Sequence, residues 1–172
     1  MTNYITDRLA ANNSETPGFF TTVVLGGLVV GILDAADAVV AFGLVNGQNP
    51  IQVLQFIASG AIGVSAFGGG LATAMLGLVF HFFIAFVVAA IYFYASLRLP
   101  ALHRQAIVFG PLYGVAVILT MTYLVFPFSN LPPSKFSLIL FINSIVGHAL
   151  FVGLPIALFA KYSARKNRTE TK

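Results

Sequence analysis

The chain has 172 residues, of which 58% are apolar and only 8% are charged. Charged residues make up about 25% of a typical soluble domain, and a water-soluble protein of this length could not cover its surface with so few. The composition therefore excludes an ordinary soluble domain and predicts an integral membrane protein. The chain contains no cysteine, which excludes disulfides, thiolate metal sites and a cysteine nucleophile.

Four apolar stretches follow a polar N-terminal segment, residues 1–18. They cover residues 19–45, 71–97, 106–126 and 136–160. Each is long enough to cross a bilayer, which takes about 20 residues of helix. Helix is expected for all four, because they do not alternate as barrel strands do and open strands would leave backbone groups unpaired in lipid. The sequence predicts an all-α fold: an integral membrane four-helix bundle over residues 19–160, followed by a basic tail, residues 161–172.

A fifth apolar stretch, residues 51–67, lies between the first two predicted spans. It opens with Asn49-Pro50, a helix-start signature with proline at the first helical position. Gln52, Gln55 and Ser59 fall on one face of a helix over about residues 50–60, and apolar residues fall on the other. We interpret this segment as a short interfacial or re-entrant helix, with a fifth span as the alternative.

Basic residues predict how the bundle is oriented. With four spans, the N-terminal segment holds Arg8, the second loop holds Arg98 and Arg104, and the tail holds five cations, whereas the third loop holds only Lys135. By the positive-inside rule, both termini face the cytoplasm, which predicts a multi-pass protein of the cytoplasmic (inner) membrane. Tyrosines near this interface are also expected, namely Tyr92, Tyr94 and Tyr162.

The basic tail predicts contact with lipid headgroups. Each cation close to an anionic membrane surface contributes about 1 kcal/mol of attraction, and the residues expected to do so are Lys161, Arg165, Lys166 and Arg168. No folded basic surface or aromatic-rich motif accompanies the tail, so nucleic acid is not an expected partner. The expected partners are the lipid bilayer and, through helix faces, other membrane subunits or a second copy of the chain.

Small residues recur at spacings of four within the spans, which predicts close approach of helix backbones. The sets are Gly27 with Gly31, Gly110 with Gly114, and Gly69 with Thr73 and Gly77. Pro155 lies inside the last predicted span and predicts a kink near Phe151, because proline frees a carbonyl one turn earlier. His103, in the second loop, is expected to be solvated.

Two charged residues fall within the predicted spans, Asp34 and Asp37, and two histidines accompany them, His81 and His148. Counted from the outer ends of the spans at about 1.5 Å per residue, all four lie about 12–18 Å deep. A carboxylate at the centre of the bilayer costs about 2.5–3.5 kcal/mol, so it is expected to face the bundle interior and to have a partner. Asn143 and Ser144 approach the same layer, and Ser144 shares a helix face with the histidine four residues later.

Three interpretations of this layer stay open. In the first, the acids and histidines form hydrogen bonds that fix helix packing, each contributing about 0.6 kcal/mol. In the second, they carry a proton or an ion, because such pairs titrate near neutral pH. In the third, they bind a divalent transition metal, or the histidines ligate a haem. No cofactor is predicted, and the candidate metal ligands are Asp34, Asp37, His81 and His148.

No motif for catalysis is present. No serine, threonine or lysine nucleophile has an accompanying base, and no glycine-rich phosphate loop follows a strand. The sequence therefore favours a non-enzymatic integral membrane protein, such as an accessory subunit, with a small proton- or ion-handling transporter or channel as the alternative.

Several short patterns together resemble one group of bacterial proteins. They are the glycine-rich first span with Gly26-Gly27, the run His81-Phe82-Phe83, Phe126-Pro127 followed by Pro132-Pro133, and Gly147-His148 in the last span. In this order they are similar to the uncharacterised YagU-like proteins of bacterial inner membranes. The resemblance implies a bacterial cytoplasmic-membrane protein with a part in acid tolerance. The paired aspartates have no counterpart in that pattern, so their role depends on the physical argument alone.

Overall fold

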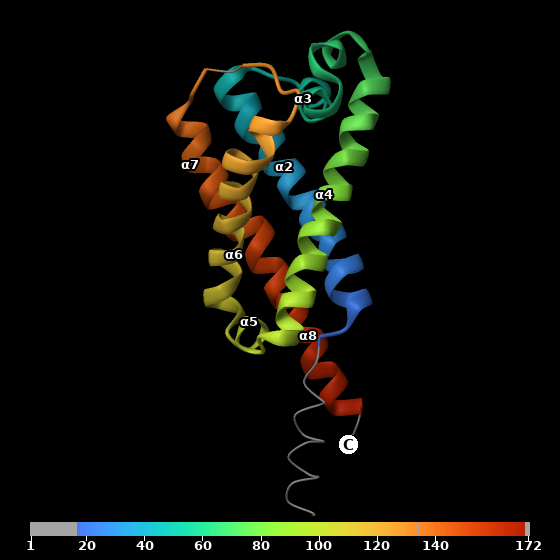
Figure 1. The fold of residues 1–172 in the computed structure, drawn as a ribbon, viewed down its shortest axis with the longest axis vertical. Helices are drawn as coiled ribbons and strands as arrows, with labels where there is room; N and C mark the ends of the chain where they lie inside the picture. Colours follow the sequence, from blue (N-terminus) through green and yellow to red (C-terminus); the bar gives the residue numbers. More distant parts are fainter. Residues whose placement is uncertain (1–16, 134, 171–172) are drawn as a thin grey trace, which may run out of the picture.

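The computed structural model describes residues 17–133 and 135–170, which are almost entirely helical and contain no strand (Figure 1). Arg8 and the rest of residues 1–16 lie outside the described residues, as do Lys172 and the side chain of Arg168. The all-α prediction is confirmed for the part of the chain that the structure describes.

Five helical segments are long and apolar enough to cross a membrane by length and composition. Most consist of two or three consecutive helices, and their bounds are η1 (Phe20–Leu25) with α2 (Gly26–Asn46); α3 (Pro50–Ile62) with η2 (Gly63–Gly68); α4 (Gly70–Arg98); α6 (Ala106–Thr120) with η3 (Met121–Val125) and η4 (Phe126–Phe128); and α7 (Leu138–Gly147) with η5 (His148–Gly153) and α8 (Leu154–Glu170). A four-residue helix, α5 (Ala101–Arg104), joins α4 to α6.

The four predicted spans all correspond to segments of this set. Their ends agree with the structure to within two residues, except at the C-terminus. There α8 continues to Glu170, so most of the basic segment expected as a tail is part of a helix. The segment expected to be interfacial or re-entrant, α3 with η2, is the fifth.

The α3–η2 segment lies across one end of the bundle. Figure 1 shows α3 end-on, with its axis across the long helices. It begins just after α2 turns at Gly47, which adopts a left-handed backbone (φ 66°), and it returns to the start of α4 at Gly70. The loop that precedes α7 closes over it, because Asn130 donates from its backbone N–H to the carbonyl of Gly60 (2.8 Å) and from Nδ2 to that of Ala61 (2.8 Å). The segment therefore starts and finishes at the same end of the molecule.

The predicted helix start at Asn49-Pro50 is confirmed. Asn49 and Gln52 form a capping box, in which each side chain accepts a hydrogen bond from the other residue's backbone N–H (3.0 and 2.9 Å). The polar face of α3 is divided. Gln52 is exposed, whereas Gln55 is buried and donates to the carbonyl of Gly70 (3.0 Å). The polar side of α3 is thus partly used to bind α4.

The other end of the bundle holds both the start of the first long helix and the last turns of α8 (Figure 1). The backbone N–H of Gly18 donates to Ser163 Oγ (3.0 Å), and Thr22 Oγ1 lies 3.2 Å from the same oxygen. Thr22 and Ser163 are both buried. These contacts hold the beginning and the end of the described chain side by side.

Glycines of α4 and α6 bring helix backbones together as their spacing predicts, whereas the glycine pair of α2 accommodates aromatic rings. A Cβ atom at Gly114 would touch the backbone of His148, and one at Gly110 would lie 2.8 Å from Leu154 Cα, so α6 packs directly on η5 and α8. On α2, Gly27 and Gly31 lie beneath the rings of Phe86 and Phe82. Gly77 of α4 meets the carbonyl of Leu54 in α3.

At the end of the bundle that holds the last turns of α8, one expectation was wrong. The three tyrosines lie near this end, where Tyr94 and Tyr162 are exposed, whereas Tyr92 is 1% exposed and donates from its hydroxyl to the carbonyl of Leu102 (2.8 Å). His103, expected to be solvated, is 4% exposed. The cause is α5, which folds the loop against the end of the bundle and buries this histidine.

Candidate functional site

Two side-chain contacts join α2 to the α7–η5 segment within the apolar part of the bundle. Asn143 Nδ2 of α7 donates to Asp37 Oδ2 of α2 at 3.0 Å. His148 Nδ1, at the first residue of η5, lies 3.8 Å from Asp34 Oδ1. We call these four residues the polar joint. They bring together two acids and one histidine of the set predicted from the sequence, with the asparagine that was expected beside them.

The local sequence explains why these residues meet. Asp34 and Asp37 are three apart on α2 and therefore share a helix face. The two segments run in opposite directions, so the later residue of α2 pairs with the earlier residue of α7. Gly147 allows the close approach, because a Cβ atom there would lie 2.5 Å from Asp37 Oδ2. This glycine was not singled out as part of the site from the sequence, although it directly precedes the histidine.

The contacts of His148 define which ring nitrogen carries a proton. Nδ1 lies 2.9 Å from the carbonyl oxygen of Ser144, and a carbonyl can only accept a hydrogen bond. Nδ1 is therefore the donor, and Nε2 is the atom that can gain or lose a proton. Ser144 contributes its carbonyl to this contact, while its hydroxyl donates to the carbonyl of Leu140 (2.8 Å). Its role in the site differs from the side-chain role expected from the sequence.

A change in helix type begins at the same histidine. Residues His148–Gly153 form the π-helix η5, directly before the α8 turn that contains Pro155. The proline was expected to produce a kink near Phe151. The structure shows a widened, π-helical turn at this position, and such turns are frequent at functional sites.

His81 has a different partner. It lies on α4, is 9% exposed, and its Nε2 is 2.8 Å from the carbonyl oxygen of Gly31 on α2. Within the described residues no hydrogen bond or ion pair connects His81 to Asp34 or Asp37. The four ionisable residues predicted as one group are therefore divided: three meet between α2 and α7–η5, and His81 joins α2 to α4.

The depth of the polar joint explains why it needs internal partners. Asp34 lies about 21 Å from the start of η1 and about 18 Å from the end of α2, so it is close to the middle of this segment. The side chains of Asp34 and His148 are 22% and 19% exposed. In a bilayer, a carboxylate at this depth is stabilised by a cationic or hydrogen-bonding neighbour. Asp37 accepts a hydrogen bond from Asn143, whereas the neighbour of Asp34 is the His148 ring, which pairs with it as a cation only when both ring nitrogens carry a proton.

A metal site receives no support from this geometry. In residues 17–133 and 135–170, no group of three or more His, Asp or Glu side chains is placed to hold a metal ion. One ring nitrogen of each histidine, Nε2 of His81 and Nδ1 of His148, lies against a backbone carbonyl, which leaves the other ring nitrogen of each as the potential ligand.

The chain was also compared with known proteins. No family model matches it, and no curated protein or solved structure matches it either. The similarity to YagU-like proteins stays a prediction.

Proposed function

We propose that this chain is a four-span protein of the cytoplasmic membrane with both termini in the cytoplasm. The bond between Gly18 and Ser163 supports an even number of crossings, since it holds the first and last long helices together at one end. The return of α3–η2 to its own end supports an interfacial or re-entrant segment. The end of α4, at Arg98, and α5, which ends at Arg104, lie at the same end of the bundle as the basic turns of α8 (Figure 1), as the positive-inside rule requires of a cytoplasmic face.

The absence of cysteine makes this topology directly testable. Lys135 lies in the loop between η4 and α7, at the end opposite Arg165. A single cysteine placed by Lys135→Cys is expected to react with a membrane-impermeant maleimide in spheroplasts. One placed by Arg165→Cys is expected to react only after the membrane is permeabilised. The reverse pattern would invert the orientation, and labelling of both in intact spheroplasts would mean that α7–η5–α8 does not cross the membrane. Gln48→Cys, between α2 and α3, tests the number of crossings: it is expected to react in intact spheroplasts, and a reaction only after permeabilisation would mean that α3–η2 is a fifth crossing.

Within this topology, the protein acts as a non-enzymatic membrane subunit, and the polar joint holds α2 against α7–η5. The observation that supports this function is that two contacts, Asp37–Asn143 and Asp34–His148, join the same two segments. Nearly all of the described chain is helix within the bundle, so partners meet it through helix faces, short loops or the end of α8.

Amide substitution tests this structural role. Asp34→Asn with Asp37→Asn is expected to leave a folded protein, because an amide oxygen still accepts a hydrogen bond from Asn143. Asp34→Leu with Asp37→Leu removes both acceptors and is expected to loosen α2, which is measured as faster proteolysis in mild detergent. Purification in the same detergent is expected to recover a complex larger than one chain. A clean monomer would contradict the accessory role.

A proton-handling function is the second candidate, and one observation favours it. His148 is oriented by the carbonyl of Ser144, which leaves Nε2 free to exchange a proton while Asp34 lies 3.8 Å from Nδ1. In vesicles containing a pH-sensitive dye, this function predicts a proton flux that His148→Gln and Asp34→Asn abolish without preventing assembly. If the native protein shows no flux above that of empty vesicles, the polar joint is structural only.

A further inference from the structure

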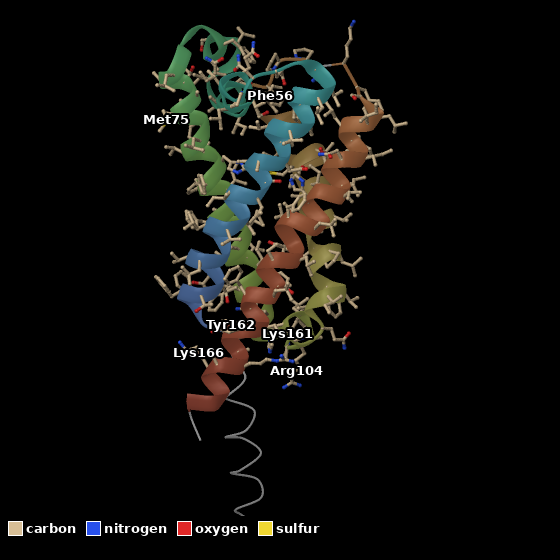
Figure 2. All side chains as sticks on the ribbon, turned by 180° about the vertical axis from the view of Figure 1, so that it is seen from behind. Phe56, Met75, Arg104, Lys161, Tyr162 and Lys166 are labelled. Atoms are coloured by element: carbon tan, nitrogen blue, oxygen red, sulfur yellow. The ribbon has the colours of Figure 1, made fainter. Side chains whose placement is uncertain are left out.

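Five cations of the described chain gather at one end of the bundle, around α5. Arg98 ends α4, Arg104 ends α5, and three more lie on α8, namely Lys161, Arg165 and Lys166. Figure 2 shows Arg104, Lys161 and Lys166 at the same end, far from Phe56 and Met75 at the opposite end. The cations thus come from three helices held together by the fold, and they are not confined to a tail.

We infer that this end of the bundle binds the headgroup of an anionic phospholipid at a site between α5 and α8. Lys161 and Arg165 are one turn apart on α8 and share a helix face. Lys161 is only partly exposed, which fixes its position beside the folded elements, whereas Arg165 is exposed. Arginine and lysine are the side chains that recognise phosphate oxygens, the former with a planar fork and the latter as a point charge.

The depth of the site matches the headgroup level. Lys161 follows Leu138, the first residue of α7, by 23 residues of nearly continuous helix, which corresponds to about 35 Å. The hydrocarbon core of a bilayer is about 30 Å thick. If Leu138 lies at the outer boundary, Lys161 reaches the headgroups of the opposite leaflet.

Exposed apolar residues next to the cations provide a surface for the acyl chains. Leu158 is 44% and Tyr162 is 63% exposed, and these two residues share a face of α8. On the neighbouring helix, Tyr94 is exposed just before Arg98. The surface therefore changes from apolar to basic within about one helical turn. This arrangement fits a lipid, which presents chains and a charged headgroup together, better than it fits a soluble phosphate compound.

The proposal rests on the topology proposed above, and its test uses a matched control. The protein is reconstituted in nanodiscs of phosphatidylcholine, alone or mixed with phosphatidylglycerol, and retained lipid is measured by native mass spectrometry. Lys161→Gln and Arg165→Gln are expected to weaken phosphatidylglycerol retention about fivefold each. The control, Lys135→Gln, removes a cation from the other end and is expected to have no effect. Circular dichroism in phosphatidylcholine alone checks that each variant folds.

Three outcomes would overturn the inference. The first is equal retention of both lipids by the native protein, and the second is an equal loss of retention caused by the control. The third is binding of inorganic phosphate, in phosphatidylcholine nanodiscs without anionic lipid, that is as strong as the retention of phosphatidylglycerol. Asp37→Asn, within the polar joint, is expected to leave retention unchanged. A failure of the lipid site is therefore distinguishable from a failure of the polar joint or, by maleimide labelling, of the topology.

Discussion

The η5 segment is held on two sides by different chemistry. Towards α6 it packs backbone to backbone, because Gly110, Gly114 and Gly153 leave no side chains between the helices. Towards α2 it is held by side chains of the polar joint. In lipid, apolar side chains gain little by leaving the solvent, so helices associate through close packing or through polar contacts. This bundle uses both mechanisms on neighbouring faces of one segment.

The two contacts should respond differently to substitution. A glycine contact depends on volume, because an added methyl group has no space between two backbones. A polar contact depends on hydrogen-bonding groups, and a substitution that preserves them should be tolerated. Substitutions that change only volume or only polarity therefore distinguish the two sides.

The largest effect is expected at the glycine contact. Gly114→Ala places a Cβ against the carbonyl of His148, and the helices must separate to accommodate it. We expect a loss of about 2 kcal/mol or more in the free energy of unfolding, measured by thermal melting in detergent. Gly68→Ala is the matched control, because no atom lies within 4 Å of a Cβ there. Equal melting temperatures for the two variants would contradict the contact.

A smaller effect is expected in the polar joint, where Asp37 and Asn143 should be energetically coupled. Replacing either residue by Ala removes one buried polar group and leaves its partner without a hydrogen bond. The change in the free energy of unfolding of a single variant therefore does not equal the contribution of the bond. A double-mutant cycle of Asp37→Ala and Asn143→Ala isolates it and should give a coupling of about 1 kcal/mol, within the range found between membrane helices. Additive effects would mean that the hydrogen bond contributes nothing to stability.

The smallest effect is expected at His81. Its Nε2–H donates to the carbonyl of Gly31, which also lies within a continuous helix and so has a backbone partner. His81→Phe should lower the free energy of unfolding by about 0.6 kcal/mol, whereas His81→Gln can still donate and should cost less. A large loss of proton flux in both variants, with folding intact, would instead place His81 in a relay with the acids.

Much of the fold was predictable because membrane spans are determined by composition and length. The ends of the predicted spans, the helix start at Asn49-Pro50 and the close approach at Gly110 and Gly114 all depend on local sequence. The helical continuation of α8 beyond residue 160 was not predicted. Its charges suggested a tail, whereas burial of Ser163 and Ala164 continues the packing to that level.

The sequence predicted the depth of the site residues along their spans, but it did not predict which of these residues contact each other. Counting residues places Asp34, His81 and His148 at one level, but it does not give the direction in which each side chain points. In the structure, His81 contacts the carbonyl of Gly31, whereas the two acids are paired with residues of α7–η5. The choice depends on which helices are neighbours, which a single sequence does not contain. The π-helix before Pro155 was also missed, because a proline in a helix is compatible with a kink or a widened turn.

The most direct test of the account is a cross-link within the polar joint. A Cβ atom at Gly147 would lie 3.2 Å from Asp37 Cγ, close to where the sulfur of a cysteine at position 37 would be. In this cysteine-free chain, Asp37→Cys with Gly147→Cys is expected to form a disulfide readily in native membranes under mild oxidation. Ala36→Cys, on an exposed face of α2, with Gly147→Cys should not. Cross-linking of the second pair but not the first would contradict the packing of α2 against α7–η5.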